Sequence, residues 1–111
     1  MKFLILGKMK DIGLALPPAL GRQLMEASVA VVNKQKKEGK IEQVYWIPGA
    51  GTSVSIGECK TAEELMRNLN EAPTADYFGF EISPLADFNE SMKILVEKMK
   101  EAEKMMVSSP K

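Results

Sequence analysis

The alternation of apolar and polar positions predicts four strands and three helices, the second of them short, along one chain. The strands are expected over residues 3–9, 40–47, 52–59 and 76–82, and the helices over 19–38, 61–71 and 87–106. Two strand–helix–strand units followed by a helix make a ferredoxin-like plan, with spatial strand order 4-1-3-2. We therefore predict an α+β fold, βαββαβ with an antiparallel sheet plus a C-terminal helix.

The length of 111 residues predicts a single domain over 1–111. Its βαββαβ core is expected over 1–85, its C-terminal helix over 86–106 and a frayed tail over 107–111.

Helix and loop signals place the boundaries of these elements. Thr61 with Glu64 forms a capping box, and Asp87 is expected to cap the last helix. Gly39 is expected to end the first helix in the left-handed conformation. The segment 11–18 is expected to be a loop, with its two prolines suited to the first turn of the following helix.

The period-two alternation predicts which side chains share a sheet face. We expect Val54 and Ile56 to face the helices together with Phe78 and Phe80. The opposite face is then expected to hold Ser53, Ser55, Gly57, Tyr77, Gly79 and Glu81. In strand 40–47, the alternation separates Ile41, Tyr45 and Ile47 from Val44 and Trp46.

The sheet face without crossover helices is expected to be too apolar to meet water. Strands 3–9 and 40–47 carry apolar side chains on both faces, and each one left in water forgoes about 1.5–3 kcal/mol of burial. A second protomer packed sheet to sheet removes this surface and predicts a homo-oligomer, a dimeric α+β barrel. The alternative is that the C-terminal helix folds over this face within one chain.

Composition narrows the classes of partner and cofactor. Lys+Arg and Asp+Glu are 15 each, so no basic excess is available for binding nucleic acid or an anionic membrane surface. Cys59 is the single cysteine, which fits a reducing, cytoplasmic setting. The sequence contains no histidine, so we expect no metal site and no cofactor. No stretch is long and apolar enough to span a membrane.

Glu81 and Tyr77 are the candidate catalytic residues. A carboxylate between two sheets is desolvated, which suits a general base, and Tyr77 could donate a hydrogen bond. Candidate ligand-binding residues are Ser53, Ser55, Tyr45 and Trp46. The alternatives are that Glu81 pairs with a lysine such as Lys8, that Tyr77 is a packed aromatic, and that Trp46 belongs to the core or an interface.

Two further features have structural interpretations. The segment 48–52 contains two glycines, but it joins two strands and is expected to be a hairpin turn rather than a phosphate cradle. Cys59 at a strand end is expected to be a small buried hydrophobe, because no histidine is available to activate it.

A series of short motifs resembles the muconolactone delta-isomerase family. They are Glu38-Gly39, Tyr45-Trp46-Ile47-Pro48-Gly49, Ser55-Ile56, Thr61-Ala62-Glu63-Glu64-Leu65, Leu69, Pro73, Tyr77, Glu81-Ile82 and Leu85. The resemblance covers roughly residues 2–85. It implies a ferredoxin-like, oligomeric, cytoplasmic protein that holds a small lactone between the sheet and neighbouring protomers and moves a proton without a cofactor.

The polar positions of the family carry over only in part. Tyr77 and Glu81 match, whereas Ala50 and Gly51 stand where the family has a histidine and a tyrosine. The middle of the first helix, residues 27–30, lacks the acidic residues of the family. Three functions stay open: cofactor-free proton transfer on a small organic acid or lactone with Glu81 as base, small-ligand binding without catalysis, and a purely structural oligomer.

Overall fold

A four-stranded antiparallel sheet forms the body of the protein, as the sequence predicts. The structure, a computed structural model, describes residues 1–108, with side chains through residue 106. The strands lie in the order β2-β3-β1-β4, which is the predicted ferredoxin-like arrangement. Their bounds are β1 Lys2–Met9, β2 Ile41–Ile47, β3 Thr52–Glu58 and β4 Phe78–Leu85.

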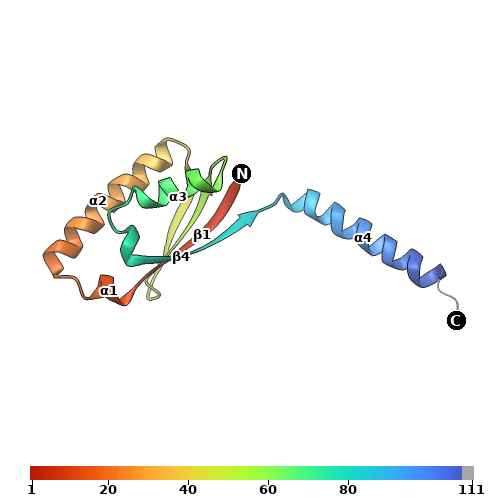
Figure 1. Ribbon diagram of the computed structural model, residues 1–111, viewed down its shortest axis with the longest axis horizontal. Helices are drawn as coiled ribbons and strands as arrows, with labels where there is room; N and C mark the ends of the chain where they lie inside the picture. The colour runs from red at the N-terminus through yellow and green to blue at the C-terminus, as the bar shows by residue number, and fades with distance from the viewer. Residues whose placement is uncertain (109–111) are drawn as a thin grey trace.

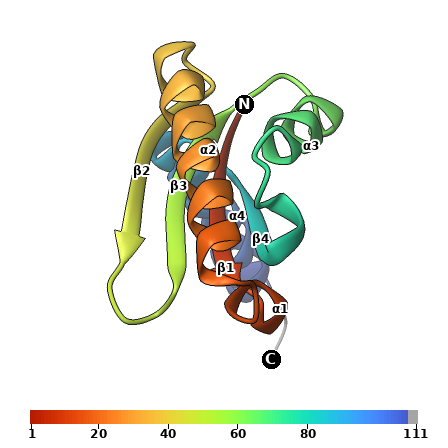
Figure 2. The ribbon, with the colours of Figure 1, turned by 90° about the vertical axis from the view of Figure 1, so that its left-hand side faces the viewer.

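Two helices cover one face of this sheet. Helix α2 (Pro18–Lys37) and helix α3 (Ala62–Asn70) lie on the same side, as Figure 2 shows. The buried core sits beneath them and consists of Phe3, Ile5, Cys59 and Leu65, with Leu69 packed against it. Both crossovers therefore place their apolar stripes on one face, and they leave the other face of the sheet without a helix.

The predicted capping signals are confirmed. The Thr61 side chain accepts a hydrogen bond from Glu64 N at 3.1 Å at the start of α3. Asp87 Oδ2 accepts from Glu90 N at 3.0 Å ahead of helix α4 (Phe88–Ser108). Gly39 follows α2 with φ 79°, the left-handed conformation that glycine adopts without steric cost.

Three boundaries differ from the sequence prediction. The segment predicted as a loop contains a short helix, α1 (Asp11–Leu14), in which the Lys10 carbonyl accepts from Gly13 N at 2.9 Å. Tyr77 was expected in a strand but lies in a 3-10 turn, η1 (Ala75–Tyr77). Strand β4 continues to Leu85, and Pro84 is tolerated there because β4 is an edge strand.

The strand register overturns the predicted faces of β3, whereas Phe80 lies on the helix-covered face and Glu81 on the opposite one, as predicted. Leu6 pairs with both Val54 and Glu81, so these three side chains share a face. Ile5 pairs with Ser55, so Ser55 lies on the buried, helix-covered face. The prediction that Ser53 and Ser55 share a face with Glu81 is therefore wrong. Alternation separates the two faces of a single strand, but the pairing register decides which of them lies beside a given face of the neighbouring strand.

A bulge in β2 changes one further assignment. Ile41 pairs with Gly57 and Gln43 with Ile56, which leaves an extra residue between them. The bulge places Ile41 on the helix-covered face with Val44 and Trp46, rather than with Tyr45 as predicted.

The face without helices, called here the open face, is apolar as expected. Its members include Leu4, Leu6, Tyr45, Ile47, Val54 and Ile56. Helix α4 does not cover it but projects from the end of β4, so that the described chain extends 72 Å along its longest axis (Figure 1). The alternative of a C-terminal helix folded over its own sheet is therefore not what the structure shows. The helix reaches Ser108, two residues past its predicted end, and residues 109–111 of the predicted tail lie outside the described residues.

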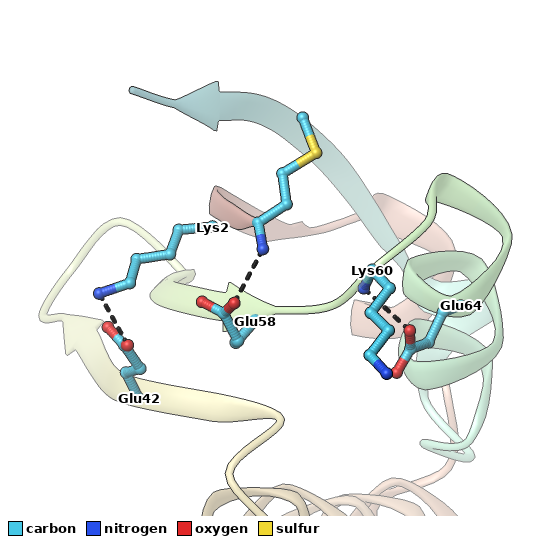
Figure 3. Close-up of polar contacts among 6 residues, drawn as sticks. Lys2, Glu42, Glu58, Lys60 and Glu64 are labelled. Carbon is cyan, nitrogen blue, oxygen red and sulfur yellow. Dashed lines mark hydrogen bonds and ion pairs between the residues drawn. The ribbon is translucent and has the colours of Figure 1, made fainter. Parts of the chain in front are cut away.

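Ion pairs and a hydrogen bond lie at the end of the sheet where β1 begins, as Figure 3 shows. Lys2 Nζ lies 2.9 Å from Glu42 Oε1, and this contact raises the pKa of Lys2. The Met1 amino group lies 2.8 Å from Glu58 Oε1, and Lys60 N donates to Glu64 Oε2 at 2.9 Å. In the described part of the chain, no helix has the length and apolar character needed to cross a membrane.

Candidate functional site

A cleft of about 380 Å³ separates helix α2 from the sheet. Apolar side chains from α2 and from strands β1, β2 and β4 form most of its wall. They include Ile5, Met25, Val29, Val32, Val44, Trp46, Phe78 and Phe80. Largely apolar concave sites with a few polar groups are where proteins usually bind small molecules.

The floor of the cleft carries two serine hydroxyls from β3. Ser53 Oγ lies 3.5 Å from the Gly7 carbonyl, a long hydrogen bond. Gly7 leaves the room for this arrangement, because a Cβ there would meet Ser53 Oγ at 2.8 Å and Phe80 Cε1 at 3.1 Å. Ser53 and Ser55 thus lie where small polar side chains can face a ligand across an otherwise apolar floor.

The helical wall of the cleft is fixed by the polar contacts of Ser28 and Gln35, two buried residues of α2. Ser28 Oγ lies 2.8 Å from Thr74 Oγ1 and accepts from Thr74 N at 3.1 Å. Gln35 Nε2 donates to the Asn68 carbonyl at 2.8 Å and to Glu71 Oε2 at 2.9 Å. These bonds join α2 to α3 and to the segment after it, so they set the width of the cleft.

Glu71 lies beside this wall, and its pKa is shifted from the usual value. The hydrogen bond from Gln35 lowers the pKa of Glu71 below its usual 4.5, and the nearby Lys40 ammonium acts in the same direction. Lys40 Nζ lies 3.7 Å from Glu71 Oε1. Glu71 is ionised at neutral pH and lies outside the lining of the cleft.

The lining of the cleft contains no carboxylate, lysine or arginine among the described residues. Its polar groups are hydroxyls, side-chain amides and the Trp46 ring nitrogen. Such a lining can hold a neutral or weakly polar molecule, but it offers no group that takes up a proton readily near pH 7.

Glu81 lies on the other side of the sheet, in a shallow depression of about 690 Å³ on the open face. The depression is bordered by two lysines and an aspartate as well as Glu81. Its lining is Leu6, Lys8, Met9, Lys10, Asp11, Thr52, Gly79, Phe80 and Glu81. Within the described residues no ion pair joins Glu81 to Lys8, so the alternative in which Lys8 neutralises Glu81 is not observed.

The remaining candidate residues are dispersed. Tyr77 lies at the edge of the sheet, where its carbonyl accepts from Lys10 N at 2.8 Å and its Cβ lies beside Gly13. Tyr45 lies at the rim of the cleft but pairs with Val54, which puts its side chain on the open face. Trp46 lines the cleft and remains 51% exposed.

Cys59 has the structural role that the sequence suggests. It is 4% exposed within the core. Burial raises the pKa of its thiol, with the neighbouring Glu64 acting in the same direction. A protonated, buried thiol is inert as a nucleophile.

Several polar residues of the two sites were missed by sequence analysis. Ser28, Thr74 and Gln35 lie in ordinary helical or loop contexts, and only tertiary contact brings them together. Lys10 and Asp11 could have been found, because they directly follow β1 at the end nearest Gly79. Within the described residues, no group of three acidic, cysteine or histidine side chains could hold a metal ion.

Comparison with known proteins places the chain in a family. The family model described as muconolactone delta-isomerase matches residues 1–91. The chain belongs to the muconolactone delta-isomerase family. This confirms the resemblance seen in the sequence. A comparison with curated proteins finds no match.

Two solved structures share the fold of this chain. A crystal structure of muconolactone isomerase superposes with a TM-score of 0.71 at 22% identity, covering 78% of this chain and 90% of that one. The 5-chloro-2-hydroxyhydroquinone dehydrochlorinase TftG from Burkholderia phenoliruptrix AC1100, in complex with 2,5-dihydroxybenzoquinone, gives a TM-score of 0.58 at 19% identity. That match covers 81% of this chain and 98% of the dehydrochlorinase. The crystal structure of muconolactone isomerase thus has the same fold as this chain.

Proposed function

We propose that this protein catalyses cofactor-free proton transfer on a small organic acid or lactone, with Glu81 as the base. The observation that carries the proposal is the depression on the open face. There a carboxylate with no ion-pair partner among the described residues lies beside apolar Leu6 and two lysines. The family assignment supports the same reaction class, since it is named for an isomerase.

The charged side chains around the depression have different roles in such a reaction. Lys8 and Lys10 can bind the carboxylate of an organic acid as ammonium groups. Glu81 can then take a proton from a carbon of the bound molecule and return it to another carbon, which balances an isomerisation without a cofactor.

A second protomer on the open face is part of this proposal. In one chain Glu81 is exposed to water, and water screens its interaction with the charges of a bound ligand. The surrounding Leu4, Val54 and Ile56 provide the apolar surface for a sheet-to-sheet contact. Such a contact encloses the depression and desolvates Glu81.

The test uses Glu81→Gln, which keeps the size of the side chain and removes the base. Purified full-length protein is incubated with muconolactone in deuterated water, and deuterium incorporation and isomer formation are followed by NMR. We expect the wild type to exchange and isomerise the lactone, and Glu81→Gln to lose about 10²-fold or more in rate. Glu63→Gln, on the exposed side of α3, is the matched control and is expected to retain the wild-type rate.

Two variants separate the proton-transfer role from the binding role. Equal rates for wild type and Glu81→Gln eliminate Glu81 as the base. Lys8→Met tests the binding role separately, because it is expected to raise KM for an anionic substrate more than it lowers kcat.

Ligand binding in the cleft beneath α2 is a second candidate function. Among the described residues the lining of this cleft has no charged group, so it fits a neutral molecule that is bound but not converted. Trp46 is the single tryptophan and lines this cleft, so its fluorescence reports on occupancy. Phenol is a suitable probe: we expect saturable binding that Ser55→Val weakens and Glu81→Gln leaves unchanged, whereas no saturable signal would exclude the cleft for this class of ligand.

A further inference from the structure

Helix α4 carries an apolar stripe with heptad spacing. Its members follow one another at alternating steps of four and three residues. They are Phe88, Met92, Leu95, Met99, Ala102 and Met106. This spacing keeps one seam of a helix facing a partner helix over its whole length, as in a left-handed coiled coil.

The stripe has no partner within the described chain. Phe88 is 72% exposed, Met99 65% and Met106 78%. The helix leaves the sheet from β4, which is an edge strand, and it projects away from the body (Figure 1). An apolar seam held in water along a three-heptad helix marks a surface for a binding partner.

Charges beside the stripe indicate which partner fits. Lys98 directly precedes Met99, and Glu103 directly follows Ala102. In a parallel, in-register pair of α4 helices, Lys98 of one copy faces Glu103 of the other across the seam. A symmetric dimer contains two such pairs. A second copy of the same helix therefore carries charges that are complementary to those beside the stripe.

Most of this helix lies outside the part of the chain that the family model matches. The family model ends at residue 91, whereas α4 continues to Ser108. Accordingly, we propose that α4 is an assembly helix that pairs with α4 of a second copy as a parallel two-stranded coiled coil. This contact is separate from the sheet-to-sheet contact of the open face, and it does not depend on the proposed catalysis.

Disulfide trapping tests the orientation directly in the full-length chain. In a parallel, in-register pair the two copies of residue 102 lie opposite each other in the seam, so Ala102→Cys is expected to form a cross-linked dimer under mild oxidation. Lys100→Cys, on the outer side of the helix, is the matched control and is expected to remain monomeric on a non-reducing gel. Cys59 is buried and does not compete. Equal cross-linking of the two variants, or none for Ala102→Cys, would overturn the proposal.

Charge insertion tests the contribution of the stripe. We expect Leu95→Glu to raise the dissociation constant of the α4 contact at least about a hundredfold, because both copies lose a buried leucine. Ile94→Glu places the same charge at a neighbouring exposed apolar position outside the stripe, and it is expected to leave the mass by analytical ultracentrifugation unchanged. An unchanged mass for Leu95→Glu would contradict the proposal.

Charge reversal identifies the pairing of the two flanking residues. Lys98→Glu and Glu103→Lys each place like charges opposite one another and are expected to weaken the contact. The double variant Lys98→Glu/Glu103→Lys restores opposite charges and is expected to recover the wild-type mass. If α4 instead docks on the open face of another copy, the double variant would not recover, and Ala102→Cys would not cross-link to itself.

Discussion

Ser28 and Thr74, 46 residues apart in the sequence, share a buried hydrogen bond of 2.8 Å between their hydroxyl oxygens. Ser28 Oγ also accepts from Thr74 N at 3.1 Å. One serine hydroxyl thus satisfies two groups of the segment that leads into η1 and β4. The contact fixes α2 relative to that segment, and with it one wall of the cleft.

Removing this hydroxyl is expected to destabilise the fold. Ser28→Ala leaves the buried N–H and hydroxyl of Thr74 without their partner, which costs about 1–3 kcal/mol. Thr74→Val retains the N–H bond to Ser28 and is expected to cost less. Urea unfolding of the two variants measures the difference, with the exposed Ser83→Ala as a near-neutral control. A loss for Thr74→Val larger than for Ser28→Ala would contradict the expected order.

Gly7 is expected to accept a side chain only at a cost in stability, because neighbouring side chains must shift to make room for it. A methyl group there meets Ser53 Oγ at 2.8 Å and Phe80 Cε1 at 3.1 Å. Gly7→Ala is therefore expected to lower the free energy of unfolding by about 1–3 kcal/mol. Gly79→Ala is the matched control on the open face, where the nearest atom, Lys10 Cε, lies 3.9 Å away. Thermal unfolding distinguishes the two, and equal effects would contradict the packing argument.

The interaction of Gln35 with Glu71 predicts a pH-dependent contribution to stability. Because the folded state lowers the pKa of Glu71 below 4.5, the contribution is present above that value and is lost as pH falls through the folded pKa. Gln35→Met removes the donor, so the pKa of Glu71 is expected to rise toward 4.5 in an NMR titration. The stability difference between the two proteins is expected to shrink at acidic pH, but not to vanish, since the Gln35 bond to the Asn68 carbonyl does not titrate.

The control for this titration is Lys40→Met. Lys40 lies 3.7 Å from Glu71 Oε1, and the hydrogen bond from Gln35 is the largest single cause that lowers the pKa of Glu71. We therefore expect a smaller rise in the pKa of Glu71 for Lys40→Met than for Gln35→Met. The reverse order would show that the ion pair, rather than the hydrogen bond, holds Glu71 ionised.

The elements of the fold were accessible to sequence analysis because their signals are local. Thr61 and Asp87 cap helices through residues three positions away, and Gly39 ends α2 through its own backbone conformation. The short helix α1 was missed, since four residues are too few to show periodicity. The turn η1 was missed for the same reason.

The candidate site was predicted only in part. Trp46, Ser53 and Ser55 do line one cleft, but Glu81 lies across the sheet from them. The sequence alternation of β3 was correct, but it could not tell which of its two faces joins the helix-covered side. The apolar half of β3, Val54 and Ile56, was expected inside, whereas the structure turns it to the open face.

By itself the sequence determined the order of the elements, their caps and the family, because these depend on neighbours along the chain. Only the tertiary structure decided which side chains meet. Ile5 lies opposite Ser55, and Leu6 lies opposite Val54 and Glu81. A shift of one residue in that register exchanges the two faces, and hydrogen bonding between strands far apart in the sequence sets it.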